Sequence, residues 1–128
     1  MSHRAEIRVR FHELDPYNHV NHTNYLAYFE TARVEYLNDV GMGMDVMKDH
    51  GYQIVVVELR AKFLAAAGLG DVLMVTTDVI DVGRVTSTWG QEMTRGEEKI
   101  ATLEVKAAIT DLSGRPRRVP DEFAAAFS

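Results

Sequence analysis

The segment from Thr23 to Val40 constrains the fold of this chain most, because much of its circumference as a helix is apolar. The residues at helical spacing that form one broad apolar face are Tyr25, Tyr28, Phe29, Ala32, Tyr36 and Val40, and Leu26, Ala27, Val34 and Leu37 widen it. Asn21 or Thr23 is a suitable N-cap residue, and Gly41 is a natural stop. Such a helix must be covered by other elements on more than one side.

Alternating apolar and polar residues predict strands on both sides of this helix. The first spans residues 5 to 13 and ends near Asp15, since Pro16 cannot continue a hydrogen-bonded ladder. Later strands are predicted at residues 53–64, 71–82, 85–93 and 99–110, with a short helix from Asp45 to His50 and a helical turn in the tail. Short turns between consecutive strands make the sheet antiparallel. We therefore expect an α+β fold in one domain of residues 1–128, with a sheet of five or six strands wrapped around one long helix.

Composition excludes several classes of protein. The 128 residues include no cysteine, which removes disulfide frameworks, thiolate nucleophiles and Cys-ligated metals. The net charge of −5 disfavours a nucleic-acid partner. The first ten residues contain no apolar segment of the kind that signal peptides have, and no apolar run in the sequence is long enough to span a membrane. We expect a cytoplasmic protein with no membrane partner.

Asp15 is the first residue that could carry chemistry. An Asp before proline commonly caps a turn, and that reading has about the same weight as a catalytic one. The catalytic reading rests on the nearby start of the long helix, where unpaired N–H groups and a partial positive charge can polarise a carbonyl. A carboxylate and an oxyanion site together are what a hydrolase of activated acyl groups requires.

His19, His22 and Glu30 are the other candidates in this region. The two histidines and Asp15 provide too few ligands for a convincing metal site, and His19 is better explained as a loop residue bonded to the backbone. His22, at the helix start, could bond to Asp15. Glu30 either pairs with Arg33 on the surface or lines a pocket and positions water. Arginines in turns, among them Arg84, are candidates for binding phosphate groups.

The stretch FHELDPYNHVNHTNYLAYFETARVEYLNDVG resembles the signature of the hotdog-fold thioesterases of the 4-hydroxybenzoyl-CoA thioesterase type. Downstream, the turn that ends at Asp71 and the Gly-Arg-Pro turn before Val119 extend the resemblance over most of the chain. The resemblance implies a hotdog fold and a homodimer with sheets joined edge to edge, often paired into a homotetramer. It also implies hydrolysis of acyl-CoA, or sometimes acyl-carrier-protein, thioesters without a metal ion or another cofactor.

The same resemblance assigns roles to individual residues. Asp15 matches the catalytic carboxylate, His22 the histidine that accompanies it, and Glu30 the acidic residue of the helix. The backbone of His22 and Thr23 matches the segment that holds the thioester carbonyl. One departure is Asn18, where many members of the family have glycine.

The leading hypothesis is therefore an acyl-CoA thioesterase in which Asp15 acts either as general base or as nucleophile. The acyl group is expected beside Tyr25 on the helix, and the CoA phosphates beside surface arginines such as Arg84. Three alternatives stay open: an acyl-carrier-protein thioesterase, a hotdog enoyl-thioester hydratase or dehydratase, and a non-catalytic module that binds acyl thioesters.

Overall fold

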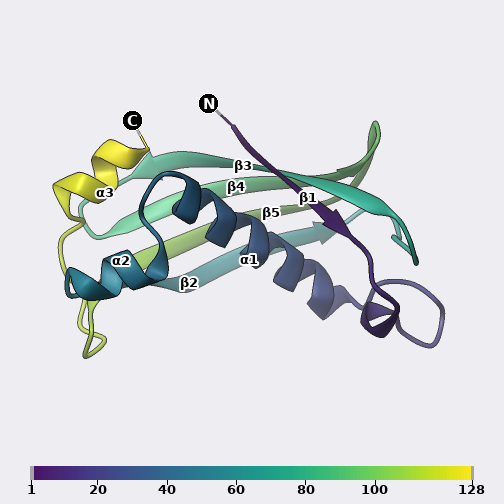
Figure 1. The fold of residues 1–128 in the computed structure, drawn as a ribbon, viewed down its shortest axis with the longest axis horizontal. Coiled ribbons are helices and arrows are strands. Elements are labelled where there is room, and N and C mark those ends of the chain that lie inside the picture. The colour runs from purple at the N-terminus through teal and green to yellow at the C-terminus, as the bar shows by residue number, and fades with distance from the viewer. Residues whose placement is uncertain (1, 128) are drawn as a thin grey trace.

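The computed structural model describes residues 2–127, in which five antiparallel strands form one sheet curled around a long helix, α1 (His22–Asp39) (Figure 1). The strands are β1 (His3–Arg8), β2 (Tyr52–Phe63), β3 (Val72–Val82), β4 (Thr86–Arg95) and β5 (Glu98–Asp111). Their order across the sheet is β1-β3-β4-β5-β2, so β1 and β2 are its edges. The predicted α+β architecture is confirmed, and four of the predicted strands agree closely with β2 to β5.

The first strand is shorter than the sequence predicted. β1 ends at Arg8, and a 3₁₀ turn, η1 (Phe11–Glu13), follows it. The Arg10 N–H donates to Glu13 Oε1 at 2.8 Å, and the Leu14 N–H donates to the Phe11 carbonyl at 3.3 Å, so local bonds replace the ladder. Phe11 is consequently 78% exposed. The prediction of a strand that continues to Asp15 was wrong.

Helix α1 packs its apolar face on the concave side of the sheet. The buried residues of the helix are Tyr25, Tyr28, Phe29, Ala32 and Leu37. Tyr36 is only partly buried, and its ring meets the rings of Trp89 and Phe127 edge to face at 5.8 and 5.3 Å. Complete burial of one such large side chain stabilises the fold by about 1.5–3 kcal/mol. This packing fixes the start of α1 at one end of the sheet.

Two short helices cover the other end. Helix α2 (Met44–Asp49) contributes the buried Met47, and helix α3 (Asp121–Ala126) contributes the buried Phe123. Phe123 also packs against Phe127, at a centroid distance of 5.0 Å. The C-terminal tail is therefore docked on the core, and its predicted helical turn is confirmed.

A β-bulge changes which residues of β2 face the helix. Val56 pairs with Ala107, but the next paired residue is Glu58, opposite Lys106, so Val57 stands outside the register. An uninterrupted alternation in the predicted strand 53–64 would put Val57 on the same face as Leu59, but the face toward α1 passes directly from Val56 to Leu59. Val56, Leu59 and Phe63, here called the β2 strip, are 44%, 45% and 47% exposed, respectively. Helix α1 leaves this apolar strip open.

Candidate active site

The segment between η1 and α1 folds back on itself as a small hairpin. Leu14 forms an antiparallel bridge with Val20, the Asp15 N–H donates to the His19 carbonyl at 2.8 Å, and the Asn21 N–H donates to the Glu13 carbonyl at 3.1 Å. Pairing in this register puts Asp15 opposite His19 at the tip. The hairpin lies at the same end of the sheet as the start of α1 (Figure 1).

The Asp15 side chain closes the hairpin tip. Its Oδ1 accepts the backbone N–H groups of Tyr17 at 2.9 Å and His19 at 3.2 Å, and Asn18 has a φ of 62°. That value lies in the left-handed region, which glycine and asparagine tolerate better than other residues. Asn18 therefore tolerates the left-handed backbone conformation that this turn requires. The turn-capping interpretation of Asp15 is correct, but Oδ1 alone performs it.

A second aspartate in the chain makes the same turn. The Asp111 N–H donates to the Arg115 carbonyl at 2.8 Å, and Asp111 Oδ1 accepts the N–H groups of Ser113 and Arg115, each at 3.0 Å. Gly114 has a φ of 91°, in the place that corresponds to Asn18. The Asp111 turn follows β5 and is not next to the start of a long helix. It is a structural control for Asp15, with the same turn in a different setting.

Helix α1 begins with one backbone donor that has no acceptor. Asn21 Oδ1 caps the helix by accepting both the N–H and the hydroxyl of Thr23, at 2.9 and 2.7 Å, and the Asn24 N–H bonds to the Asn21 carbonyl at 2.9 Å. Within residues 2–127, no acceptor pairs with the His22 N–H. The Thr23 donors, which the sequence assigned to the ligand, are occupied by the cap. The His22 N–H is the donor open to a carbonyl.

Two side chains of α1 anchor the helix start to Glu13, at the base of the hairpin. The Tyr28 hydroxyl donates to Glu13 Oε1 at 2.8 Å, and Asn24 Nδ2 donates to the Glu13 carbonyl at 2.9 Å. Burial, together with the bond to Glu13, raises the pKa of the Tyr28 hydroxyl well above its usual value. Glu13 could not be identified from the sequence, because its role depends on the 3₁₀ turn that stands in place of the predicted strand.

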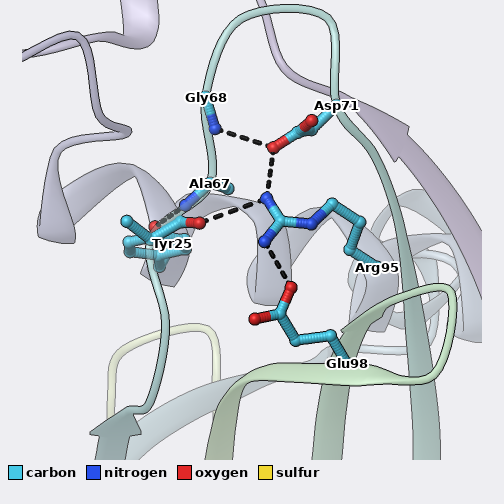
Figure 2. A network of polar contacts seen from close by, with 7 residues as sticks. Tyr25, Ala67, Gly68, Asp71, Arg95 and Glu98 are labelled. Atoms are coloured by element: carbon cyan, nitrogen blue, oxygen red, sulfur yellow. Dashed lines mark hydrogen bonds and ion pairs between the residues drawn. The ribbon is translucent and has the colours of Figure 1, made fainter.

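Residues 65–71 form a loop that supports the hairpin from the other side. The buried Tyr25 hydroxyl accepts the Ala67 N–H at 2.9 Å, and the Ala67 carbonyl accepts the Val20 N–H at 2.9 Å. Figure 2 shows how Arg95 holds this loop: it donates to Asp71 at 2.5 Å and also contacts Glu98, while Asp71 accepts the Gly68 N–H at 2.9 Å. The Gly68 bond and the Arg95 pair lower the pKa of Asp71. The Tyr25 hydroxyl therefore ties α1 to this loop as a hydrogen-bond acceptor.

The structure does not bring all the candidate residues together. The exposed His22 imidazole lies edge-on to Phe63, with ring centroids 6.3 Å apart, and within residues 2–127 no hydrogen bond or ion pair joins it to Asp15. Arg84 lies in the turn between β3 and β4, where its carbonyl accepts the Val119 N–H at 2.7 Å. That turn is at the far end of the 11-residue β3, roughly 36 Å from the end beside the hairpin. Within one chain, Arg84 therefore does not line the start of α1.

Glu30 lines a groove between α1 and β2. This α1–β2 groove has a volume of about 300 Å³, and its lining residues are Glu30, Arg33, Val34, Leu37, Met44, Ile54, Val55, Val56, Trp89, Val105 and Ala107. The β2 strip continues from Val56 in the groove to Phe63 beside His22. A larger hollow, of about 510 Å³, is ringed by charged side chains such as Arg60 and Glu92 and has no contact with the hairpin. The α1–β2 groove is the apolar site that leads to the helix start.

The part of the chain that the structure describes contains neither a metal-binding cluster nor a membrane-spanning helix. Residues 2–127 hold no cluster of three or more His, Asp or Glu side chains that could bind a metal ion. No helix in this part of the chain has the length and apolar character needed to cross a membrane.

Comparison with known proteins places the chain in a family. The family model described as thioesterase-like superfamily matches residues 9–127. An acyl-CoA thioesterase, YbgC, from Haemophilus influenzae is 33% identical over 123 residues, which cover 94% of this chain and 90% of the relative. The chloroplastic acyl-acyl carrier protein thioesterase ATL2 of Arabidopsis thaliana is 29% identical over 98% of this chain and 68% of its own length. A hypothetical protein from Aquifex aeolicus superimposes with a TM-score of 0.93 at 26% identity, over 98% of each chain. The chain therefore belongs to the thioesterase-like superfamily and has its hotdog fold.

Proposed function

We propose that this chain hydrolyses acyl-CoA thioesters to a free acid and CoA, with no metal ion. The observation that carries the proposal is the unpartnered His22 N–H at the positive end of an 18-residue helix, beside the hairpin that presents Asp15. Within residues 2–127, Asp15 Oδ2 has no hydrogen-bond partner, so one carboxylate oxygen is available for chemistry. The name of the Haemophilus influenzae relative supports CoA as the carrier.

In the proposed reaction, the thioester carbonyl oxygen accepts the His22 N–H. Asp15 removes a proton from water, the resulting hydroxide adds to the carbonyl carbon, and negative charge develops on the oxygen held by the helix. The C–S bond then breaks and CoA leaves as a thiolate, which takes up a proton. In the alternative route, Asp15 itself attacks the carbonyl carbon, the C–S bond breaks and CoA leaves as a thiolate that takes up a proton, and water then hydrolyses the mixed anhydride and restores Asp15. Glu30 lies about 12 Å further along the helix axis, so we assign it to the acyl groove instead of the carbonyl.

The test is thiol release from a panel of acyl-CoAs by the wild type, Asp15→Asn and Asp111→Asn. We expect Asp15→Asn to lower kcat/KM by about 10²–10⁴, the usual contribution of a general base. Asp111→Asn removes the same kind of turn carboxylate away from the helix start and should leave kcat/KM near the wild-type value. Similar losses in the two variants would mean that Asp15 only caps its turn.

The product separates the alternatives. A hydratase or dehydratase releases no thiol and returns an intact enoyl or hydroxyacyl thioester, which mass spectrometry detects. A binding module shows saturable binding with no turnover. A parallel panel of acyl-carrier-protein thioesters determines the carrier: a kcat/KM higher than for the matching acyl-CoA would overturn the proposal of CoA.

We also propose a homodimer that forms through β2, or a homotetramer built from two such dimers. The support is the position of β2 at a sheet edge, with unpaired backbone groups and the apolar β2 strip exposed. Light scattering measures the mass directly. Leu59→Glu should dissociate the dimer, whereas Leu112→Glu, at a residue that is 51% exposed outside β2, should not. A monomeric wild type at micromolar concentration would contradict this assembly.

A further inference from the structure

Arg33 lines the α1–β2 groove, and no carboxylate forms an ion pair with it within residues 2–127. Arg33 Nη1 donates to Gln91 Oε1 at 2.8 Å, and this is its one hydrogen bond within residues 2–127, where it makes no ion pair. A guanidinium has five N–H donors and remains charged in proteins. Burial lowers the pKa of Arg33 from its usual value, while the nearby Glu30 acts in the opposite direction. Arg33 lines a groove whose other lining residues, apart from Glu30, are apolar.

A buried polar network holds the guanidinium in place. Gln91 is only 5% exposed, and its Nε2 donates to the Phe29 carbonyl at 2.9 Å and to Thr77 Oγ1 at 3.0 Å. Both bonds orient the amide so that Oε1 points at Arg33. Thr77 is fully buried. Burying a polar group destabilises the fold unless the group is fully hydrogen-bonded. This bonded network beneath the helix therefore holds the Arg33 guanidinium in one position.

The groups around Arg33 determine which kind of ligand group could bind to its free N–H donors. Glu30 lines the same groove one helical turn earlier, so a donor and an acceptor lie side by side. A carboxylate in the groove would be attracted by Arg33 and repelled by Glu30. A neutral oxygen has no such conflict: a keto oxygen accepts from Arg33, and a hydroxyl can also donate to Glu30.

We propose that Arg33 is a specificity-determining residue that selects acyl groups carrying a neutral oxygen substituent, hydroxyl or keto, far from the thioester. The inference rests on the proposed function. The acyl chain runs from the His22 N–H along α1 into the α1–β2 groove. His22 and Arg33 are about 16 Å apart along the helix axis, and helical side chains lean back toward the N-terminus. The substituent therefore belongs near the end of a medium-length chain.

The test compares decanoyl-CoA with 10-hydroxydecanoyl-CoA for the wild type, Arg33→Met, Arg33→Lys and Arg118→Met. The wild type should favour the hydroxylated substrate in kcat/KM. Arg33→Met should reduce that preference by about 10- to 100-fold, as expected for loss of a hydrogen bond from a charged donor. Arg33→Lys should retain part of the preference. Arg118→Met, at an exposed arginine outside the groove, should retain all of it.

Three results would overturn the inference. One is an equal ratio of kcat/KM in all four proteins. The second is a stronger preference of the wild type for 9-carboxynonanoyl-CoA than for the hydroxylated substrate. The third is an unchanged ratio combined with weaker self-association of Arg33→Met by light scattering, which would assign Arg33 to a second copy of the chain.

Failure of the inference is distinguishable from failure of the proposed function. If no protein releases thiol from any acyl-CoA, hydrolysis is refuted, and binding becomes the readout for Arg33. Calorimetry with thioether analogues of the two CoA compounds, in which a methylene replaces the carbonyl, measures the same preference without turnover. Tighter binding of the hydroxylated analogue that is lost in Arg33→Met supports the role of Arg33, and equal binding overturns it.

Discussion

His22 offers a way to remove one backbone hydrogen-bond donor without removing the helix. His22 is the first residue of α1, where proline is favoured because the N–H has no helical acceptor and φ is already suitable. The preceding residue, Asn21, has φ −61° and ψ 138°, the extended conformation that a following proline requires. His22→Pro therefore deletes both the N–H and the imidazole, and His22→Ala deletes the imidazole alone.

The magnitude follows from the bonding at the helix start. The Thr23 and Asn24 N–H groups are already bonded to Asn21, so His22→Pro leaves no free donor among the first three residues of the helix. Loss of one oxyanion donor typically lowers kcat by about 10²–10³, or about 2.7–4 kcal/mol. We expect that loss in His22→Pro relative to His22→Ala. The difference between the two variants isolates the backbone group.

The assay is initial-rate thiol release at saturating and subsaturating acyl-CoA, with thermal unfolding measured at one protein concentration. His22→Pro should unfold within about 1 kcal/mol of the wild type, because proline at a compatible position reduces the entropy of the unfolded chain. If His22→Pro and His22→Ala have equal kcat, the His22 N–H does not hold the carbonyl, and the reasoning from the helix cap is refuted.

Three other substitutions test the supports of the site by thermal or urea unfolding. Arg95→Met should lower the free energy of unfolding by about 1 kcal/mol, a small value because the ion pair with Asp71 is partly exposed to solvent. Lys99→Met, in the exposed pair with Glu92, should change the free energy of unfolding little. Because the fold lowers the pKa of Asp71, the ionised carboxylate stabilises the folded state above about pH 4, and this stabilisation is lost as the pH falls further. The destabilisation by Arg95→Met should therefore be largest above about pH 4 and shrink below it; a destabilisation that does not vary with pH would contradict the role of the Asp71 pair. Asn21→Ala should cost about 1 kcal/mol through the lost cap, and no change would contradict the cap. Asn18→Ala should cost about 1 kcal/mol and Asn18→Gly less, since φ is 62°; equal losses would argue against the left-handed turn.

Much of the fold could be predicted because the spacing of apolar residues along the chain determines which segments form helices and which form strands. The pattern around Tyr25 and Phe29 predicts a helix that needs cover, and the alternation through Val105 predicts a strand buried on one face. The errors arose where a local side-chain bond or an irregularity in the backbone pairing interrupts such a pattern. Glu13 captures the Arg10 N–H and ends β1 early, and the bulge at Val57 shifts the register of β2. Neither event alters the alternation of the residues themselves.

The site was less predictable because it depends on distances across the fold. Asp15 was recognised from its neighbours, but its bond to the His19 backbone, and not to the His22 ring, follows from the hairpin register. Arg84 was chosen as a turn arginine, and only the strand order shows that its turn lies at the opposite end of the sheet. Arg33 looks like an ordinary surface charge on a helix until Gln91 is seen beneath it.

The hairpin that carries Asp15 also has a consequence for the order of folding. Its internal bonds join residues only a few positions apart, so the turn can close within the timescale of short-loop formation, about 10–100 ns. The bond from Val20 to Ala67, in contrast, joins segments far apart in sequence and must wait for loop closure across α1 and β2. The carboxylate turn and its bonds to the start of α1 are therefore local and can form early, whereas the docking of the hairpin on residues 65–71 must come later. A chain that has collapsed without docking residues 65–71 should have a formed turn and no working site.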